Sequence, residues 1–355
     1  MKTILLLAAA AISSTAAASD IADPIPDVPT PGAIKQFRDW AVGCDNVKDC
    51  EALALAQDGE DNGATLLVTR TAGPGSQPSI VIPFPGVVRA MALLIDGQRV
   101  PQTPRVSDGA IRFGPIASAA LVPQMLKGTR LEVIDDQGLV VAVISLAGAS
   151  AALTWIDDQQ GRIGTQTALV RPGVKLPTAV PPRTPPPVVA VPKADRTAPP
   201  AKLAVKALAQ LRTDSGCALE GNGHDRESWQ RLDASHSLLL LSCGSGAYNE
   251  TSAIYVITGS GGKKPKLTTA PARFDLPPPW SEDAHAPMLV NAGWDAKAGV
   301  LSSMSKGRGP GDCGSSEKYV WDGASFRMIE QRAMDECRGS THWIRTWVAD
   351  AAQAR

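Results

Sequence analysis

Three glycines near the C-terminus have the spacing of a nucleotide-binding loop. Gly309, Gly311 and Gly314 match the pattern Gly-x-Gly-x-x-Gly, which binds a dinucleotide when a following helix holds the pyrophosphate at its N-terminus. The next residues, Lys318–Trp321, favour a strand instead, because aromatic and β-branched side chains are enriched in strands. We therefore interpret this segment as a glycine-rich loop and expect no cofactor.

Histidines and carboxylates are the next groups that could do chemistry. An enzyme acting on envelope glycans or peptides would need a cleft with a perturbed acid or base. The candidates for that role are His224, His285 and Asp312. Adjacent carboxylates such as Asp135 and Asp136 point to opposite faces of an extended chain, so they do not form a glycosidase pair. We name no catalytic residue, and an enzyme remains the alternative to a binding protein.

The cysteines predict disulfides and no metal site. The six are Cys44, Cys50, Cys217, Cys243, Cys313 and Cys337. They include no Cys-x-x-Cys pair and show no zinc-ligand spacing to a histidine. Cys44 and Cys50 are alone in the N-terminal half, so we expect them to pair. The other four allow three pairings, of which we favour Cys217–Cys243 and Cys313–Cys337, since each joins near neighbours.

Tryptophans gather near the C-terminus, where five of the eight follow residue 279. We favour a role in the core of a small β-domain. Exposed tryptophans would instead stack on sugars or anchor a partner, and they would form a candidate binding surface with nearby charged residues. That surface comprises Trp280, Trp294, Trp321, Trp343, Arg308, Asp312 and Arg338.

The first 18 residues are typical of a secretory signal peptide. Lys2 gives a positive start, Ile4–Ile12 form a short apolar run, and Ala16 and Ala18 give a small-x-small cleavage pattern. This run is too short to span a membrane, and no other apolar run reaches the length required. We expect cleavage near Ala18 and a periplasmic or secreted protein, in agreement with paired cysteines.

The elements that must position these residues are mainly strands. In the N-terminal half we expect strands at Thr65–Thr71, Ser79–Pro83, Met91–Ile95, Arg130–Ile134 and Leu139–Leu146, with a Cys44–Cys50 hairpin before them. Short helices are expected at Ile116–Leu126 and Ala149–Ile156. In the C-terminal half we expect strands at Leu238–Leu241, Ala253–Ile257, Lys266–Thr269, Val300–Ser303, Tyr319–Trp321 and Phe326–Ile329. This spacing of strands and turns predicts a mainly β protein with two antiparallel domains of sandwich or meander type and a few short helices.

A proline-rich segment divides the chain. Nine prolines lie between Pro177 and Pro200, which argues against a packed helix or sheet and predicts a semi-rigid linker. Residues 161–206 hold eight basic residues and one acidic residue, whereas residues 19–160 hold ten basic and seventeen acidic ones. We therefore expect a disordered segment at 19–33, a β domain at 34–160, a basic linker at 161–206 and a tryptophan-rich, disulfide-bonded β domain at 207–355.

Two short motifs mark the ends of the first domain. One is Phe37-x-x-Trp40-x-Val42-x-Cys44 with Cys50-Glu51-Ala52, and the other is Val143-x-x-Leu146-Ala147-Gly148-x-x-x-Ala152-Leu153. Both resemble the invasion-associated locus B family. The whole chain is similar to a related family of exported two-domain proteobacterial proteins with no assigned function, through Asp157-Asp158-x-Gln160-x-Arg162 and Glu336-Cys337-Arg338-Gly339. The resemblance implies export and a β-rich fold, and it implies no activity.

The overall charge of the chain argues against one class of function, nucleic-acid binding. Basic and acidic residues number 35 each, and this balance argues against a nucleic-acid binder, which normally carries a basic excess. Our leading hypothesis is a non-enzymatic envelope protein that binds a periplasmic protein or peptidoglycan. The alternatives are an enzyme acting on envelope glycans or peptides, and an inhibitor of cell-wall hydrolases that presents the loop Gly307–Gly314.

Overall fold

The structure is a computed structural model that describes residues 28–56, 64–84, 92–193, 198–217, 227–259, 266–281 and 285–354. It is mainly β, with several antiparallel sheets and, within these residues, three α-helices. This confirms the predicted fold class. The predicted signal peptide and residues 19–27 of the expected disordered segment lie outside the described residues. No helix in the described part of the chain is long and apolar enough to cross a membrane.

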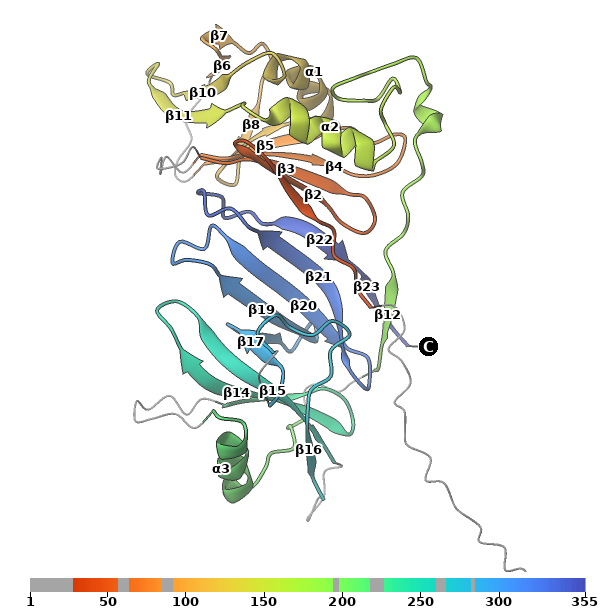
Figure 1. The fold of residues 1–355 in the computed structure, drawn as a ribbon, viewed down its shortest axis with the longest axis vertical. Helices are drawn as coiled ribbons and strands as arrows, with labels where there is room; N and C mark the ends of the chain where they lie inside the picture. Colours follow the sequence, from red (N-terminus) through yellow and green to blue (C-terminus); the bar gives the residue numbers. More distant parts are fainter. Residues whose placement is uncertain are drawn as a thin grey trace, which may run out of the picture.

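The N-terminal half is built on a seven-stranded antiparallel sheet (Figure 1). Its strands, in spatial order, are β1 (Ile34–Phe37), β2 (Trp40–Cys44), β3 (Cys50–Ala54), β4 (Leu66–Arg70), β5 (Ser79–Pro83), β9 (Ala110–Phe113) and β8 (Arg105–Ser107). Successive side chains point to opposite faces of a strand, so Trp40 enters one apolar core and Ala41 another. Both faces of this sheet are therefore covered around β2.

A smaller sheet and two helices cover the face that carries Trp40. The small sheet has the order β11 (Val140–Ser145), β10 (Arg130–Ile134), β6 (Ala92–Ile95) and β7 (Gln98–Arg99). The helices are α1 (Pro115–Met125) and α2 (Ala149–Gln159). In α2, the side chains of Ala149, Ala152, Leu153 and Ile156 are buried, which is the three- and four-residue spacing of an amphipathic helix. The opposite side of α2 is left facing solvent.

The C-terminal half is a sandwich of two five-stranded sheets. One contains β13 (Glu227–Arg231), β14 (His236–Ser245), β15 (Glu250–Thr258) and β16 (Thr268–Pro271), with β17 (Met288–Val290) also paired to β15. The other has the order β18 (Gly293–Asp295), β19 (Val300–Lys306), β20 (Gly314–Trp321), β21 (Phe326–Met334) and β22 (Ile344–Val348). Side chains from both sheets, such as Ile254 and Tyr319, form the core between them. Helix α3 (Val205–Asp214) packs on the outer face of β14 and β15.

Three disulfides join the pairs Cys44–Cys50, Cys217–Cys243 and Cys313–Cys337. These are the pairings favoured from the sequence. The first joins directly opposed residues of β2 and β3. The third connects the loop before β20 to the segment that follows β21.

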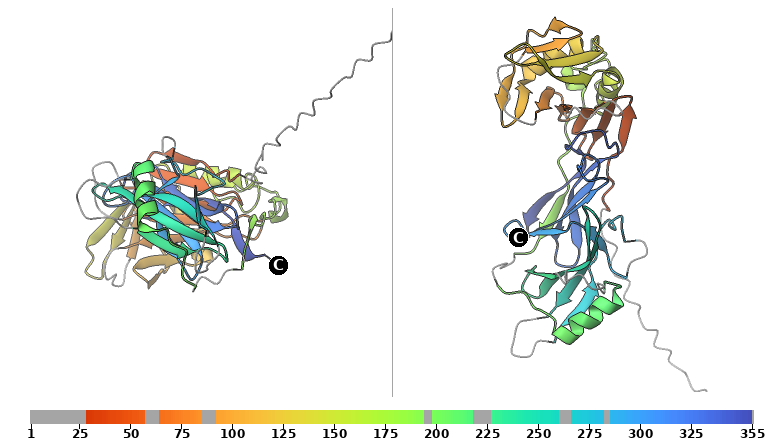
Figure 2. Two further views of the ribbon diagram at one scale, coloured as in Figure 1. Left: turned by 90° about the horizontal axis from the view of Figure 1, so that it is seen from below. Right: turned by 90° about the vertical axis from the view of Figure 1, so that its left-hand side faces the viewer.

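The segment from 161 to 206 differs from the extended linker expected above, because parts of it pack against the rest of the molecule. Arg162, Thr165 and Val180 are buried, and a short 3-10 helix occupies Pro177–Ala179. Further on, β12 (Val188–Val191) pairs in parallel with β23 (Asp350–Gln353). The four residues of β12 contain no proline, so their backbone donors remain free to join a sheet. Figures 1 and 2 show this segment passing along both halves of the molecule.

The two halves also share a core of their own. Ala41, Leu53 and Leu67 of the N-terminal sheet pack with Trp343 and Ile344 at one end of the C-terminal sheet. The Asn46 side chain donates to the Val348 carbonyl at 3.0 Å and accepts from the Val348 amide at 2.8 Å. These contacts hold β22 next to the β2–β3 hairpin.

Candidate functional site

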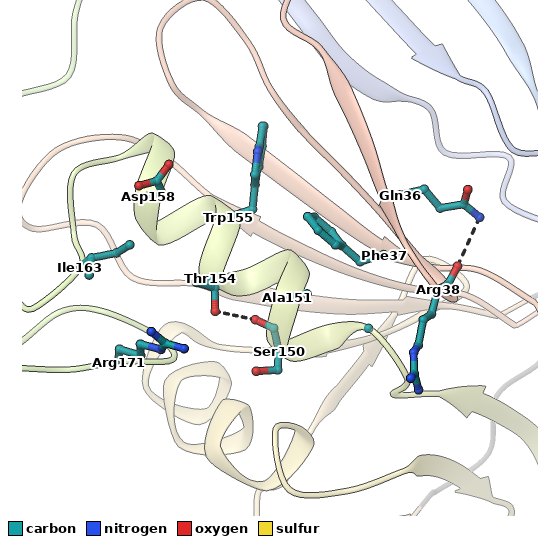
Figure 3. Close-up of a pocket in the computed structure, with 11 residues that line it drawn as sticks. Gln36, Phe37, Arg38, Ser150, Ala151, Thr154, Trp155, Asp158, Ile163 and Arg171 are labelled. Atoms are coloured by element: carbon teal, nitrogen blue, oxygen red, sulfur yellow. Dashed lines mark hydrogen bonds between the residues drawn. The ribbon is translucent and has the colours of Figure 1, made fainter.

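An open groove of about 970 Å³ lies over the solvent-facing side of α2 (Figure 3). Three segments line it: the end of β1 with the turn that follows, the outer face of α2, and residues from 163 to 171. Phe37, Trp155 and Ile163 supply apolar surface, and Ser150 and Thr154 supply hydroxyl groups. A concave site of this size with apolar walls and a few polar groups is typical of ligand binding.

The groove depends on a close approach between α2 and the turn after β1. Gly148 caps the N-terminus of α2 with φ of 109°, a left-handed conformation that favours glycine. A Cβ at this position would lie 1.8 Å from the carbonyl oxygen of Phe37. Gly148 therefore lets the helix start directly against the turn, which places Phe37 and Trp155 in one surface.

Charged side chains occupy both ends of the groove. In the view of Figure 3, Arg38 lies at the right, near the N-terminal end of α2, whereas Arg171 lies at the lower left, on the same side as Ile163 and Asp158. Within the described residues, the structure records no ion pair for any of the three side chains. Eight residues separate Ser150 from Asp158, or about 12 Å along a helix axis. The site thus offers one cation on each side of α2 in this view and one anion at the C-terminal end of the helix.

A buried ion cluster fixes the C-terminal end of α2 beneath this surface. Asp157 Oδ1 lies 3.3 Å from Arg70 Nη1, and Asp157 Oδ2 accepts from the amides of Leu169 and Val170 at 2.7 and 3.0 Å. Burial raises the pKa of Asp157, against the lowering effect of these partners. Burial, together with the nearby charge of Arg162, lowers the pKa of Arg70 to about 10. The cluster ties residues 162–170, one wall of the groove, to α2 and β4.

A second pocket, of about 320 Å³, lies under β12. Its charged groups face one another: Arg327 Nε lies 3.0 Å from Asp275 Oδ2, and Arg327 Nη1 lies 3.6 Å from Asp322 Oδ2. The groove over α2 is larger and its charges are not satisfied in this way. We therefore take the groove as the candidate site.

The tryptophans named from the sequence do not come together in one surface. Trp321 and Trp343 are buried, the first in the core of the sandwich and the second where the two halves meet. Trp294 is partly buried, and Trp280 is 61% exposed. The Trp321 indole also donates to Asp233 Oδ2 at 2.7 Å.

The charged residues named with them have structural contacts. Arg308 forms an ion pair with Asp312 in the loop just before Cys313, and this pair holds the pKa of Asp312 at about 2. Arg338 reaches the N-terminal half, where its Nη2 lies 2.6 Å from Asp39 Oδ1. The surface proposed from the sequence is therefore divided between a loop, two cores and the contact between the halves.

The candidate acids and bases are also apart. His224 lies outside the described residues, and His285 is exposed. His236 and His342 have carboxylate partners, with His236 Nδ1 2.8 Å from Asp233 Oδ2 and His342 Nε2 2.9 Å from Glu51 Oε2. Among the described residues, no group of three or more His, Cys, Asp or Glu side chains is placed to hold a metal ion.

Sequence reasoning missed the groove because its walls are far apart in the chain. The one local signal was α2, where Ser150, Thr154 and Asp158 recur every four residues on the side opposite the apolar stripe. Nothing in the sequence indicated that Phe37 and Arg38 would meet that side. The groove comes from tertiary packing.

Comparisons with known proteins identify a family. A family model described as a protein of unknown function, DUF1176, matches residues 34–350. The uncharacterized protein YpfG of Escherichia coli (strain K12) is 27% identical over 336 residues, which cover 89% of this chain and 93% of that protein. No solved structure matches the chain. The resemblance to the invasion-associated locus B family remains a prediction. Since the matched range includes both halves and the groove between β1 and α2, the chain belongs to the DUF1176 family of proteins of unknown function.

Proposed function

We propose that this protein is an exported binding protein of the bacterial cell envelope and that its groove over α2 binds a short peptide of the cell wall. The observation that carries the proposal is the lining of the groove. Apolar side chains share one open surface with three charges that form no ion pair within the part of the chain that the structure describes. Such charges remain hydrated until a ligand of opposite charge replaces the water.

The positions of the charges indicate the ligand chemistry. Arg38 and Arg171 suit carboxylates, because a guanidinium donates two parallel hydrogen bonds to a carboxylate. Asp158 suits an amine. An extended peptide advances about 3.3 Å per residue, so a chain of about four residues spans the roughly 12 Å from Ser150 to Asp158 along α2. Wall peptides carry free carboxylates and amines on a short extended chain, and their small side chains fit against Phe37 and Trp155.

Three disulfides support export, because structural disulfides persist in oxidising compartments. The signal-peptide pattern in residues 1–18 supports the same location. Neither observation depends on the groove, so location and binding are tested separately.

Co-sedimentation with purified peptidoglycan sacculi tests the proposal. The full chain is compared with the variant Arg38→Glu/Arg171→Glu at low and high salt. We expect the wild type to sediment with sacculi and the variant to bind about tenfold more weakly, since two attractive contacts become repulsive. The matched control is Arg99→Glu, which reverses an exposed charge on β7, outside the groove.

Three results would count against the proposal. Wild-type protein that stays in the supernatant at low salt would exclude sacculi as the ligand. Equal loss of binding in Arg99→Glu would show that overall charge is responsible. Unchanged binding by the double variant would place the ligand elsewhere, with the basic residues between 161 and 206 as the next surface to change.

A further inference from the structure

The rim of the groove contains a residue in an unusual backbone conformation. Arg38, in the turn between β1 and β2, has φ of 55°, a left-handed value that residues other than glycine rarely adopt. Its side chain is one of the two groove cations. The direction in which that cation points therefore depends on what keeps the turn in place.

Part of the turn is held from within the N-terminal half. The Asp39 amide donates to the Ala147 carbonyl at 3.1 Å, and Asp39 Oδ2 accepts from the Ser145 hydroxyl at 2.6 Å. These contacts connect the turn to the segment just before α2. The Gln36 side chain also donates from Nε2 to the Arg38 carbonyl at 3.2 Å (Figure 3). The outer side of the turn is left to other partners.

The outer side is held by Arg338 of the C-terminal half. Its guanidinium donates from Nη2 to Asp39 Oδ1 at 2.6 Å, from Nη1 to the Arg38 carbonyl at 3.2 Å and from Nε to the Ala56 carbonyl at 2.7 Å. The Arg338 carbonyl in turn accepts from the Ala56 amide at 3.1 Å. The side chain is only 9% exposed, so water competes little for these bonds.

Arg338 is itself fixed on both sides. The residue before it, Cys337, is bonded to Cys313. The residue after it, Gly339, donates its amide to Asp312 Oδ2 at 2.8 Å. The segment that carries Arg338 is thus anchored to the start of β20, and the guanidinium is presented at a set position.

We propose that Arg338 is a positioning residue for the groove, by which the C-terminal half holds the Arg38–Asp39 turn in its binding geometry. The inference rests on the proposed function, because it assigns the use of this contact to ligand binding. Arg338 is not among the residues that line the groove. Its effect is transmitted through the Arg38 carbonyl and the Asp39 carboxylate, about 300 residues away in sequence.

The test combines hydrogen exchange with sacculi binding in the full chain. In Arg338→Ala we expect faster amide exchange in peptides that cover residues 34–40, and sacculi binding weaker by about two- to thirtyfold. Arg338→Lys retains a charge for Asp39 but loses the forked contacts. We therefore expect its amide exchange in residues 34–40 and its sacculi binding to lie between those of the wild type and Arg338→Ala. The matched control is Arg332→Ala, which removes contacts to Glu51 and the Trp343 carbonyl in the same interface without touching the turn. Its exchange in residues 34–40 should equal that of the wild type.

A double variant separates positioning from direct contact with the ligand. If Arg338 acts through Arg38, then Arg338→Ala adds little further loss of binding to Arg38→Ala. Additive losses would overturn the proposal. So would unchanged exchange in residues 34–40 of Arg338→Ala, whether or not the wild type binds sacculi. Absence of wild-type binding with altered exchange would reject the proposed ligand and retain Arg338 as the residue that sets the turn.

Discussion

Two neighbouring aspartates at the end of α2 show how position determines the role of a residue. Asp157 is 1% exposed and contacts Arg70, whereas Asp158 faces the groove. From the sequence, adjacent carboxylates indicated only that they do not form a glycosidase pair. Asp157 is buried because it contacts Arg70 of β4 and the amides of Leu169 and Val170. These partners lie outside α2, so the spacing of residues along the helix does not reveal them.

This difference gives a stability prediction. Asp157→Ala leaves the buried Arg70 guanidinium without its anion, so we expect a loss of about 3–5 kcal/mol in the free energy of unfolding. Asp158→Ala removes an exposed carboxylate and should change the free energy of unfolding by less than about 0.5 kcal/mol. Urea unfolding of both variants measures the difference. Equal values for the two would show that the buried cluster contributes nothing to stability.

Residue identity predicted some contacts better than others. The disulfide pairs could be inferred because each joins cysteines close in sequence. Arg338 was named from the sequence as part of a ligand surface, yet its partner Asp39 is 299 residues away. A guanidinium has the same chemistry for a ligand carboxylate and for an aspartate of its own chain. Only the fold distinguishes the two.

At the scale of elements, short apolar runs between turns predicted the bounds of some strands closely. The strands Ser79–Pro83 and Arg130–Ile134 have the expected bounds. The elements that were not expected include β12, β13 and α3. β12 is four residues between prolines, β13 is largely polar, and α3 begins only five residues after two prolines, so local composition concealed all three.

The packed proline-rich segment leads to a proteolysis prediction. Arg183 pairs with Asp49, with Nη2 2.9 Å from Oδ2, and nearby Val180 is buried. Lys202 and Lys206 are exposed. In limited trypsin digestion we therefore expect cleavage after Lys202 and Lys206 before cleavage after Arg183. Mass spectrometry of early fragments gives the order, and early cleavage after Arg183 would mean that residues 161–183 are not held against the N-terminal half.

At the scale of the whole molecule, charge is distributed unevenly across the contact between the halves. The N-terminal half contributes carboxylates, namely Asp39, Asp45, Asp49 and Glu51, and the C-terminal half contributes cationic groups, namely Arg332, Arg338, His342 and Arg345. Arg345 Nη2 lies 2.8 Å from Asp45 Oδ2 and 3.2 Å from Asp49 Oδ2. Part of the excess of acidic residues in 19–160, which is visible in the sequence, is thus paired with cationic side chains of the C-terminal half.

This arrangement makes stability depend on pH. For Glu51, the hydrogen bond and charge of His342 and the charge of Arg332 outweigh burial and lower the pKa. The pKa values of Asp39 and Asp49 are also lowered. Hydrogen bonds from Ser145 and Arg338 to Asp39, and from Arg183 and the Ala72 amide to Asp49, together with the arginine charges, outweigh burial. A carboxylate with a lowered pKa stabilises the fold above its unfolded pKa, and that contribution is lost as pH falls through the folded value. Burial raises the pKa of Asp45, which contributes with the opposite sign.

We therefore expect the free energy of unfolding to fall as pH is lowered from about 5 to 3, the range just around and below the unfolded values of these groups. Glu51→Gln keeps an oxygen acceptor for His342 but does not titrate, so its unfolding free energy should fall less over the same range. Thermal or urea unfolding at several pH values gives both curves. Parallel curves for wild type and Glu51→Gln would mean that Glu51 does not carry this dependence.

The central claim is that the groove over α2 holds the ligand, and a hydrogen-exchange footprint tests it most directly. The full chain is measured with and without soluble wall peptides released by digestion of sacculi. We predict protection in peptides that cover residues 34–40 and 148–163, with no change around the exposed Trp280. Protection confined to the region of Trp280, or none at saturating peptide, would contradict the assignment of the groove.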